Sequence, residues 1–98
     1  MWRWHEWMPV EDPENVVTLG EGDTPLLDAP RLAASGGFTS LRIKDEGNNP
    51  TGSFKARGLS AAISKAKELG TRAIALPTAG NAGGAAAEVV GVLGQDAG

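Results

Sequence analysis

Short apolar runs alternate with helix-length periodic segments in the second half of this 98-residue chain. Residues 41–44 alternate apolar and charged side chains, which predicts a strand, and the apolar run 73–76 suits a buried strand. Each run leads through a loop to a predicted helix, the first over residues 53–69 and the second from residue 81 to about residue 93. This order is typical of an α/β fold with parallel strands, in which both strand-to-helix loops lie at the carboxyl edge of the sheet.

The first predicted helix has the clearer pattern. Ser53 is a favourable N-cap and Gly70 is a favourable stop after the last turn. The second predicted helix is rich in alanine, and its glycines weaken it while permitting close packing on a sheet. One face of the first helix is apolar: Leu59, Ala62, Ile63, Ala66 and Leu69.

The chain is predicted to form one domain over residues 1–98, with an irregular N-terminal region at 1–40 and a strand–helix–strand–helix core at 41–98. Three tryptophans at positions 2, 4 and 7 indicate either an anchor on an apolar surface, in this chain or outside it, or a short strand packed on the domain. The turn-rich loop 20–25 contains Gly-x-Gly, but Pro25 stands where a dinucleotide fingerprint needs its third glycine.

Composition excludes several kinds of chemistry. Hydrophobic content of 41% and charged content of 21% fit a soluble globular protein, and a net charge of −3 gives no footprint for nucleic acid. Cysteine and tyrosine are absent and His5 is the only histidine, so disulfides, thiolate catalysis and multi-histidine metal sites are excluded within this sequence. No apolar run approaches the roughly 20 residues of a membrane span, and the N-terminus lacks the apolar core of a signal peptide. We therefore expect a cytoplasmic protein with no nucleic-acid, membrane or metal partner.

Lys55 follows a Pro/Gly turn and stands at the predicted start of the first helix. The positive end of the helix dipole makes a protonated ammonium unfavourable there, and a neutral amine can form a Schiff base with an aldehyde. The turn alone favours an ordinary surface lysine, because structural lysines far outnumber catalytic ones.

The loop 77–84 precedes the second predicted helix and consists mainly of small residues. Backbone N–H groups at a helix N-terminus can bind a carboxylate or phosphate, and Thr78 and Asn81 add a hydroxyl and an amide. Taken alone, this loop favours a simpler interpretation in which Asn81 caps its own helix. Together, an amine, an amide and an anion-binding backbone suit a cofactor with an aldehyde and a phenolate oxygen, and a substrate with a carboxylate; pyridoxal phosphate with an amino acid fits that description.

The sequences of these segments resemble those of the threonine synthases, which are members of the tryptophan-synthase-β-like, fold-type II group of pyridoxal phosphate enzymes. The resemblance covers nearly the whole chain to about residue 87, and the opening residues 1–3 are also similar to some bacterial members. It rests on four segments: 19–26 (LGEGDTPL), 44–47 (KDEG), 49–58 (NPTGSFKARG) and 77–84 (PTAGNAGG).

This resemblance implies roles for particular residues. Lys55 would be the catalytic residue, holding pyridoxal 5'-phosphate through a Schiff base and moving protons. Asn81 would bind the 3′-oxygen of the cofactor, and Phe54 would flank it. The α-carboxylate of the substrate would be held by four residues of the loop: Thr78, Gly80, Asn81 and Ala82. The implied reaction converts O-phospho-L-homoserine and water to L-threonine and phosphate.

Members of this family are several times longer and have two domains, and the parent enzyme is expected to be a monomer or a homodimer. The family's glycine-rich phosphate loop and the partner of its pyridine nitrogen have no counterpart in residues 1–98, and residues 88–98 drift from the family pattern. We therefore expect part of a parallel-sheet fold, inactive by itself. A dehydratase or cysteine synthase relative, and a non-catalytic α/β remnant that retains an anion site, stay as alternatives.

Overall fold

A computed structural model describes residues 1–97. Its regular elements are a pair of short strands, three α-helices and three short 3-10 helices. In chain order they are η1 (Trp2–Trp7), η2 (Pro13–Asn15), β1 (Leu26–Asp28), α1 (Pro30–Gly36), β2 (Arg42–Lys44), η3 (Glu46–Asn48), α2 (Lys55–Glu68) and α3 (Asn81–Ala97).

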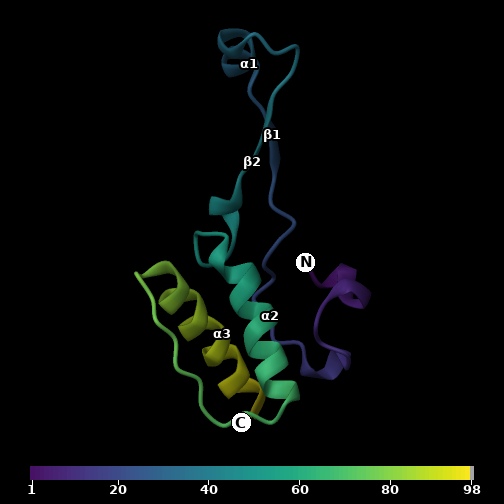
Figure 1. Ribbon diagram of the computed structural model, residues 1–98, viewed down its shortest axis with the longest axis vertical. Coiled ribbons are helices and arrows are strands. Elements are labelled where there is room, and N and C mark those ends of the chain that lie inside the picture. The colour runs from purple at the N-terminus through teal and green to yellow at the C-terminus, as the bar shows by residue number, and fades with distance from the viewer. Residues whose placement is uncertain (98) are drawn as a thin grey trace.

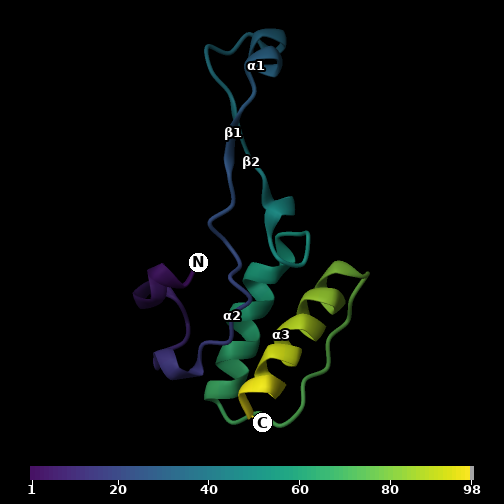
Figure 2. The ribbon, with the colours of Figure 1, turned by 180° about the vertical axis from the view of Figure 1, so that it is seen from behind.

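Helices α2 and α3 lie side by side and run in the same direction, so that both N-termini lie at the same end of the pair (Figures 1 and 2). The extended chain between them returns along their length. The fully buried core lies where these helices meet the N-terminal chain, at Val17, Ile63 and Val89, with Leu19, Leu59 and Ala86 packed against it. Burial of each large aliphatic side chain contributes about 1.5–3 kcal/mol.

Two serines on α2 hold the N-terminal chain against the helix. The backbone N–H of Val17 donates to Ser64 Oγ at 2.7 Å, and Ser60 Oγ lies 2.7 Å from the Val17 carbonyl oxygen. Both serines are fully buried and lie one helical turn apart on the same face. A buried segment outside a sheet needs such partners, because its backbone polar groups cannot reach water.

The N-terminal residues form η1 rather than a strand, and only one of the three tryptophans acts as an anchor. The Nε1–H group of Trp2 lies 2.9 Å from Glu21 Oε1 and 3.1 Å from Ser60 Oγ. In contrast, Trp4 and Trp7 are 57% and 83% exposed.

Strand β2 confirms the strand predicted at 41–44, but its partner differs from the prediction. It pairs with β1 in antiparallel register, with Leu27 opposite Ile43, and the described residues contain no parallel pair. This hairpin extends away from the helices and carries α1 at its far end (Figure 1).

The predicted strand at 73–76 does not form within residues 1–97. This segment is extended, but no other strand of the described chain lies beside it to accept its backbone hydrogen bonds. A strand requires such a neighbour, and the apolar pattern of 73–76 cannot supply one. Ile74 and Leu76 remain 55% and 39% exposed.

Both ends of α2 fall close to the prediction. The helix begins at Lys55, so Phe54 and not the predicted Ser53 occupies the N-cap position, although the Lys55 N–H lies 3.3 Å from Ser53 Oγ. It ends at Glu68, and Gly70, two residues further on, has a positive φ of 75°. Here the N–H groups of Gly70 and Thr71 donate to the carbonyl oxygens of Lys67 and Ala66, the bonding pattern of a Schellman motif. Of the helices in residues 1–97, none has the length and apolar character that crossing a membrane requires.

Candidate functional site

A cavity of about 330 Å³ lies where the N-termini of α2 and α3 come together. Lys55 and residues 77–82 line it. The parallel arrangement of the two helices produces this convergence, because the extended chain after α2 carries the polypeptide back to the end at which α2 began (Figure 2). A cavity of this size is at the lower end of the range for small-molecule sites.

Lys55 is the first residue of α2 and is exposed to solvent. Its Nζ lies 5.1 Å from the centre of the Phe54 ring, a cation–π contact. It forms no ion pair with a carboxylate in the part of the chain that the structure describes, so no salt bridge holds the amine. Phe54 is 59% exposed and lies beside the lysine without lining the cavity.

Thr78 caps α3. Its Oγ1 accepts hydrogen bonds from the N–H groups of Gly80 and Gly83 at 2.9 and 2.8 Å. The capping residue is therefore Thr78 and not Asn81, which is the first residue of the helix. A hydroxyl oxygen that accepts two hydrogen bonds still carries its own proton, which Thr78 can donate to a ligand oxygen.

The first turn of α3 requires a glycine at position 83. A Cβ atom at Gly83 would lie 2.8 Å from Thr78 Cγ2, closer than carbon atoms approach. A Cβ atom at Gly80 would have no neighbouring atom within 4 Å. The glycine at 83 thus permits the cap, whereas the space beside Gly80 stays free at the mouth of the loop.

A polar cluster supports the start of α2 on the side away from this cavity. Arg57 donates from Nε to Glu46 Oε1 and from Nη2 to Glu46 Oε2, the latter at 3.0 Å, and Thr24 donates its hydroxyl to the same carboxylate. The hydrogen bonds from Arg57 and Thr24 lower the pKa of Glu46 to about 2. Asn49, buried, donates from Nδ2 to the Glu46 carbonyl at 2.8 Å and accepts from Gly22 N–H at 2.9 Å.

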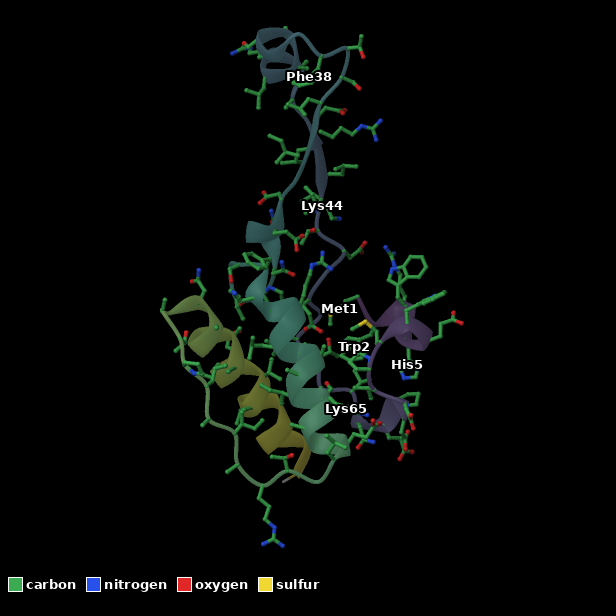
Figure 3. The ribbon with its side chains drawn as sticks, viewed as in Figure 1. Met1, Trp2, His5, Phe38, Lys44 and Lys65 are labelled. Atoms are coloured by element: carbon green, nitrogen blue, oxygen red, sulfur yellow. The ribbon has the colours of Figure 1, made fainter. Side chains whose placement is uncertain are left out.

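A buried carboxylate, Glu21, connects the loop 20–25 to the body of the molecule. Ser60 Oγ lies 2.6 Å from its Oε1, and Trp2 Nε1–H donates to the same atom. Trp2 lies between the N-terminal segment and α2 (Figure 3). Burial raises the pKa of Glu21, but hydrogen bonds from Ser60, Leu19 N–H and Thr18 outweigh this and leave the pKa below its ordinary value.

Most of the predicted site residues meet in one place. Lys55, Thr78, Gly80, Asn81 and Ala82 line the cavity together, and Phe54 is adjacent. The sequence interpretation did not identify the supporting residues around them: Thr24, Glu46, Asn49 and Arg57. All of these fall inside the quoted segments 19–26, 44–47 and 49–58, so the available signal was the presence of polar residues within the segments that carry the resemblance.

The chain is similar in sequence to known proteins over most of its length. The model of the family described as "Pyridoxal-phosphate dependent enzyme" matches residues 17–97. The chain is 50% identical over 82 residues to a threonine synthase of Synechocystis and 42% identical over 81 residues to one of Methanocaldococcus jannaschii. A threonine synthase of Mycobacterium leprae is 48% identical over 80 residues.

These alignments cover 82–83% of this chain but 20–22% of the relatives. The chain thus spans about a fifth of the length of the curated relatives that it matches. The family model, in contrast, matches well over half of the chain, from the core residue Val17 through the cavity to the end of α3. The chain belongs to the family of pyridoxal-phosphate dependent enzymes.

Proposed function

We propose that this chain is the lysine-bearing region of a threonine synthase, which converts O-phospho-L-homoserine and water to L-threonine and phosphate. The observation that carries the proposal is the cavity in which Lys55 faces the loop 77–82. The three relatives described above are threonine synthases, which favours this reaction over that of a dehydratase or a cysteine synthase.

The donors at the cavity fit pyridoxal phosphate, the family's cofactor. Its aldehyde requires a primary amine, and Lys55 offers one that no carboxylate of the described chain holds in an ion pair. Its ring oxygen requires a hydrogen-bond donor, and the Asn81 side-chain amide is available, since it makes no hydrogen bond among residues 1–97. When bound, the pyridine ring supplies an electron sink for charge that develops at the substrate α-carbon.

The loop 77–82 would hold the α-carboxylate of the substrate. It lies at the N-terminus of α3, where the helix dipole and backbone N–H groups favour an anion. Because the Thr78 oxygen already occupies the N–H groups of Gly80 and Gly83, the N–H groups of Asn81 and Ala82 and the Thr78 hydroxyl proton are the donors left for a carboxylate. Lys55, opposite this loop, would remove and return protons at the substrate.

The family's parallel sheet gives a role to the extended segment 73–76. We propose that in the longer protein this segment pairs with a neighbouring strand, so that α2 and α3 cover the sheet. A cytoplasmic location and a monomeric or homodimeric state belong to the same proposal.

Reductive labelling tests the assignment of Lys55. Pyridoxal phosphate is added to the chain, borohydride fixes any bond to an amine, and mass spectrometry locates the label. We expect the label on Lys55. Lys67, on the same helix but near its other end, is the internal comparison. Equal labelling of both lysines would contradict the assignment.

The reaction itself is tested in a protein of the relatives' length that carries this sequence. Release of phosphate from O-phospho-L-homoserine, with formation of threonine, supports the proposal. Release of ammonia from threonine or serine would instead identify a dehydratase, and absence of any turnover despite labelling of Lys55 would favour a non-catalytic remnant.

A further inference from the structure

Lys55 and Arg57 lie on nearly opposite sides of α2. Successive residues in an α-helix are turned by about 100°, so residues two apart differ by about 200°. Lys55 accordingly faces the cavity beside α3, while Arg57 faces the loop 20–25 and η3. A contact that fixes Arg57 therefore also fixes the side of α2 from which the Lys55 side chain projects.

Arg57 is held more firmly than the other ion-paired arginines of the described chain. Its guanidinium binds both carboxylate oxygens of Glu46, and its side chain is 30% exposed. The other ion-paired arginines, Arg3 and Arg42, are 67% and 63% exposed and approach one carboxylate oxygen each. A bidentate pair constrains orientation as well as distance.

Glu46 is itself held from two directions. Thr24 donates to its carboxylate, and Lys44 Nζ donates to the Thr24 carbonyl oxygen. Asn49 then joins the Glu46 backbone to Gly22. The loop 20–25, η3 and the first turn of α2 thus form one hydrogen-bonded unit, although they are separate in the sequence.

We propose that the Glu46–Arg57 pair is a positioning device that sets the rotation of the first turn of α2 and so directs the Lys55 amine at the loop 77–82. Glu46 and Arg57 are positioning residues and touch neither cofactor nor substrate. The catalytic role of this positioning rests on the proposed function of Lys55. The contacts between Glu46 and Arg57 do not depend on that function.

Gly22 gives a second way to disturb the pair without removing its charges. A Cβ atom at Gly22 would lie 2.9 Å from Arg57 Nη1 and 2.8 Å from the N-terminal nitrogen. Gly20 provides a matched control, because its φ of +83° is close to the +89° of Gly22 while a Cβ atom there meets open space. Gly22→Ala and Gly20→Ala thus share the backbone strain, and only the first displaces Arg57 and the N-terminal Met1.

The test compares Glu46→Gln with Glu68→Gln in the full 98-residue chain. Both changes replace a carboxylate that accepts hydrogen bonds from a cation and has a lowered pKa, but Glu68 lies at the far end of α2. Reductive labelling with pyridoxal phosphate is the first measurement. Nuclear Overhauser contacts between the Lys55 side chain and the methyl groups of Ala79 and Ala82, without cofactor, are the second.

We expect Glu46→Gln to reduce labelling of Lys55 roughly tenfold relative to Lys67 and to remove the contacts, since small misplacements of a reacting group have effects of that order or larger. Glu68→Gln should leave both measurements near those of the original chain. Gly22→Ala should act like Glu46→Gln, and Gly20→Ala like Glu68→Gln.

The outcomes separate the two proposals. Unchanged labelling and contacts in folded Glu46→Gln, or in Gly22→Ala if the first variant does not fold, would overturn the positioning role and leave the function of Lys55 intact. A different outcome would support positioning but count against the proposed function. In that outcome the Overhauser contacts of Lys55 depend on Glu46, but pyridoxal phosphate does not label Lys55 preferentially.

Discussion

Glu68 shows how single side chains attach the N-terminal region to the helical body. Its carboxylate accepts hydrogen bonds from the N–H groups of Asp12 and Glu11 at 2.9 and 3.0 Å and from Lys65 Nζ at 2.7 Å. The Asp12 N–H, the Lys65 ammonium and the Glu11 N–H lower the pKa of Glu68 to about 2. Glu46 shares this behaviour at the other end of α2.

The lowered pKa values predict how stability depends on pH. In the unfolded chain these carboxyls titrate near 4.5, so above that pH their contribution to folding is complete, and it is lost as the pH falls from about 4.5 toward about 2. We expect Glu68→Gln to make the free energy of unfolding less dependent on pH in this range, because the variant takes up about one proton fewer on unfolding. Urea unfolding midpoints measured from neutral to acidic pH test this.

Glu6→Gln is the control for that prediction, because the Glu6 side chain is exposed and makes no hydrogen bond within residues 1–97. This variant should retain the pH dependence of the original chain. The same slope in Glu68→Gln and the original chain would show that Glu68 is not protonated preferentially on unfolding.

At the scale of elements, the arrangement of α2 and α3 creates the site. Both helices start at the same end of the pair, so the lysine at the first position of one faces the capped turn of the other. The fully buried core residues Ile63 and Val89 join the helices further along their length. The site thus lies at one end of a packed helix pair.

The N-terminal cap of α3 gives the prediction at this scale. Thr78→Val removes the oxygen that accepts the N–H groups of Gly80 and Gly83, and it should destabilise the start of α3 by about 1 kcal/mol. Thr78→Ser, which retains the hydroxyl, should lose less. Amide hydrogen exchange at Gly83 measures the difference, and equal protection in the two variants would argue against the cap.

At the scale of the whole molecule, several apolar surfaces have no partner in the described chain. The hairpin exposes Leu26, Leu27 and Ile43 at about half of their surface, and α1 lies at its far end. Beside the helices, Leu59, Ile74 and Leu76 line an open apolar hollow of about 330 Å³. Exposed apolar surface of this kind marks a region that packs against further protein.

The extended segment 73–76 provides a direct test of the strand pairing proposed for it. Its amides have no partner strand within residues 1–97, so we expect them to exchange with solvent far faster than the amides of Ile63 and Ser64 in α2. In a protein of the relatives' length, the same amides should become protected. Protection already present in the 98-residue chain would indicate pairing between copies and would contradict the expectation.

Local patterns in the sequence were enough to predict the helical parts of the site. Periodicity and end signals placed α2 within two residues at its start, and the loop chemistry identified Lys55 and the turn before α3. These features were predictable because a helix is stabilised by neighbours three and four residues apart and by caps adjacent to its ends. Strand β2 was predictable for the same local reason, since alternation reveals which residues can form a strand.

Tertiary structure decided which distant residues meet. The Glu46–Arg57–Thr24 cluster and the bonds from Ser60 and Ser64 to Val17 join residues that no local pattern connects. The same reason explains the failure of the strand predicted at 73–76, because a strand depends on a hydrogen-bonding neighbour that its own sequence does not encode. The sequence by itself thus determined α2, α3 and the place of Lys55 at the start of α2. The packing of α2 between α3 and the N-terminal chain decided what this lysine faces and what holds it there.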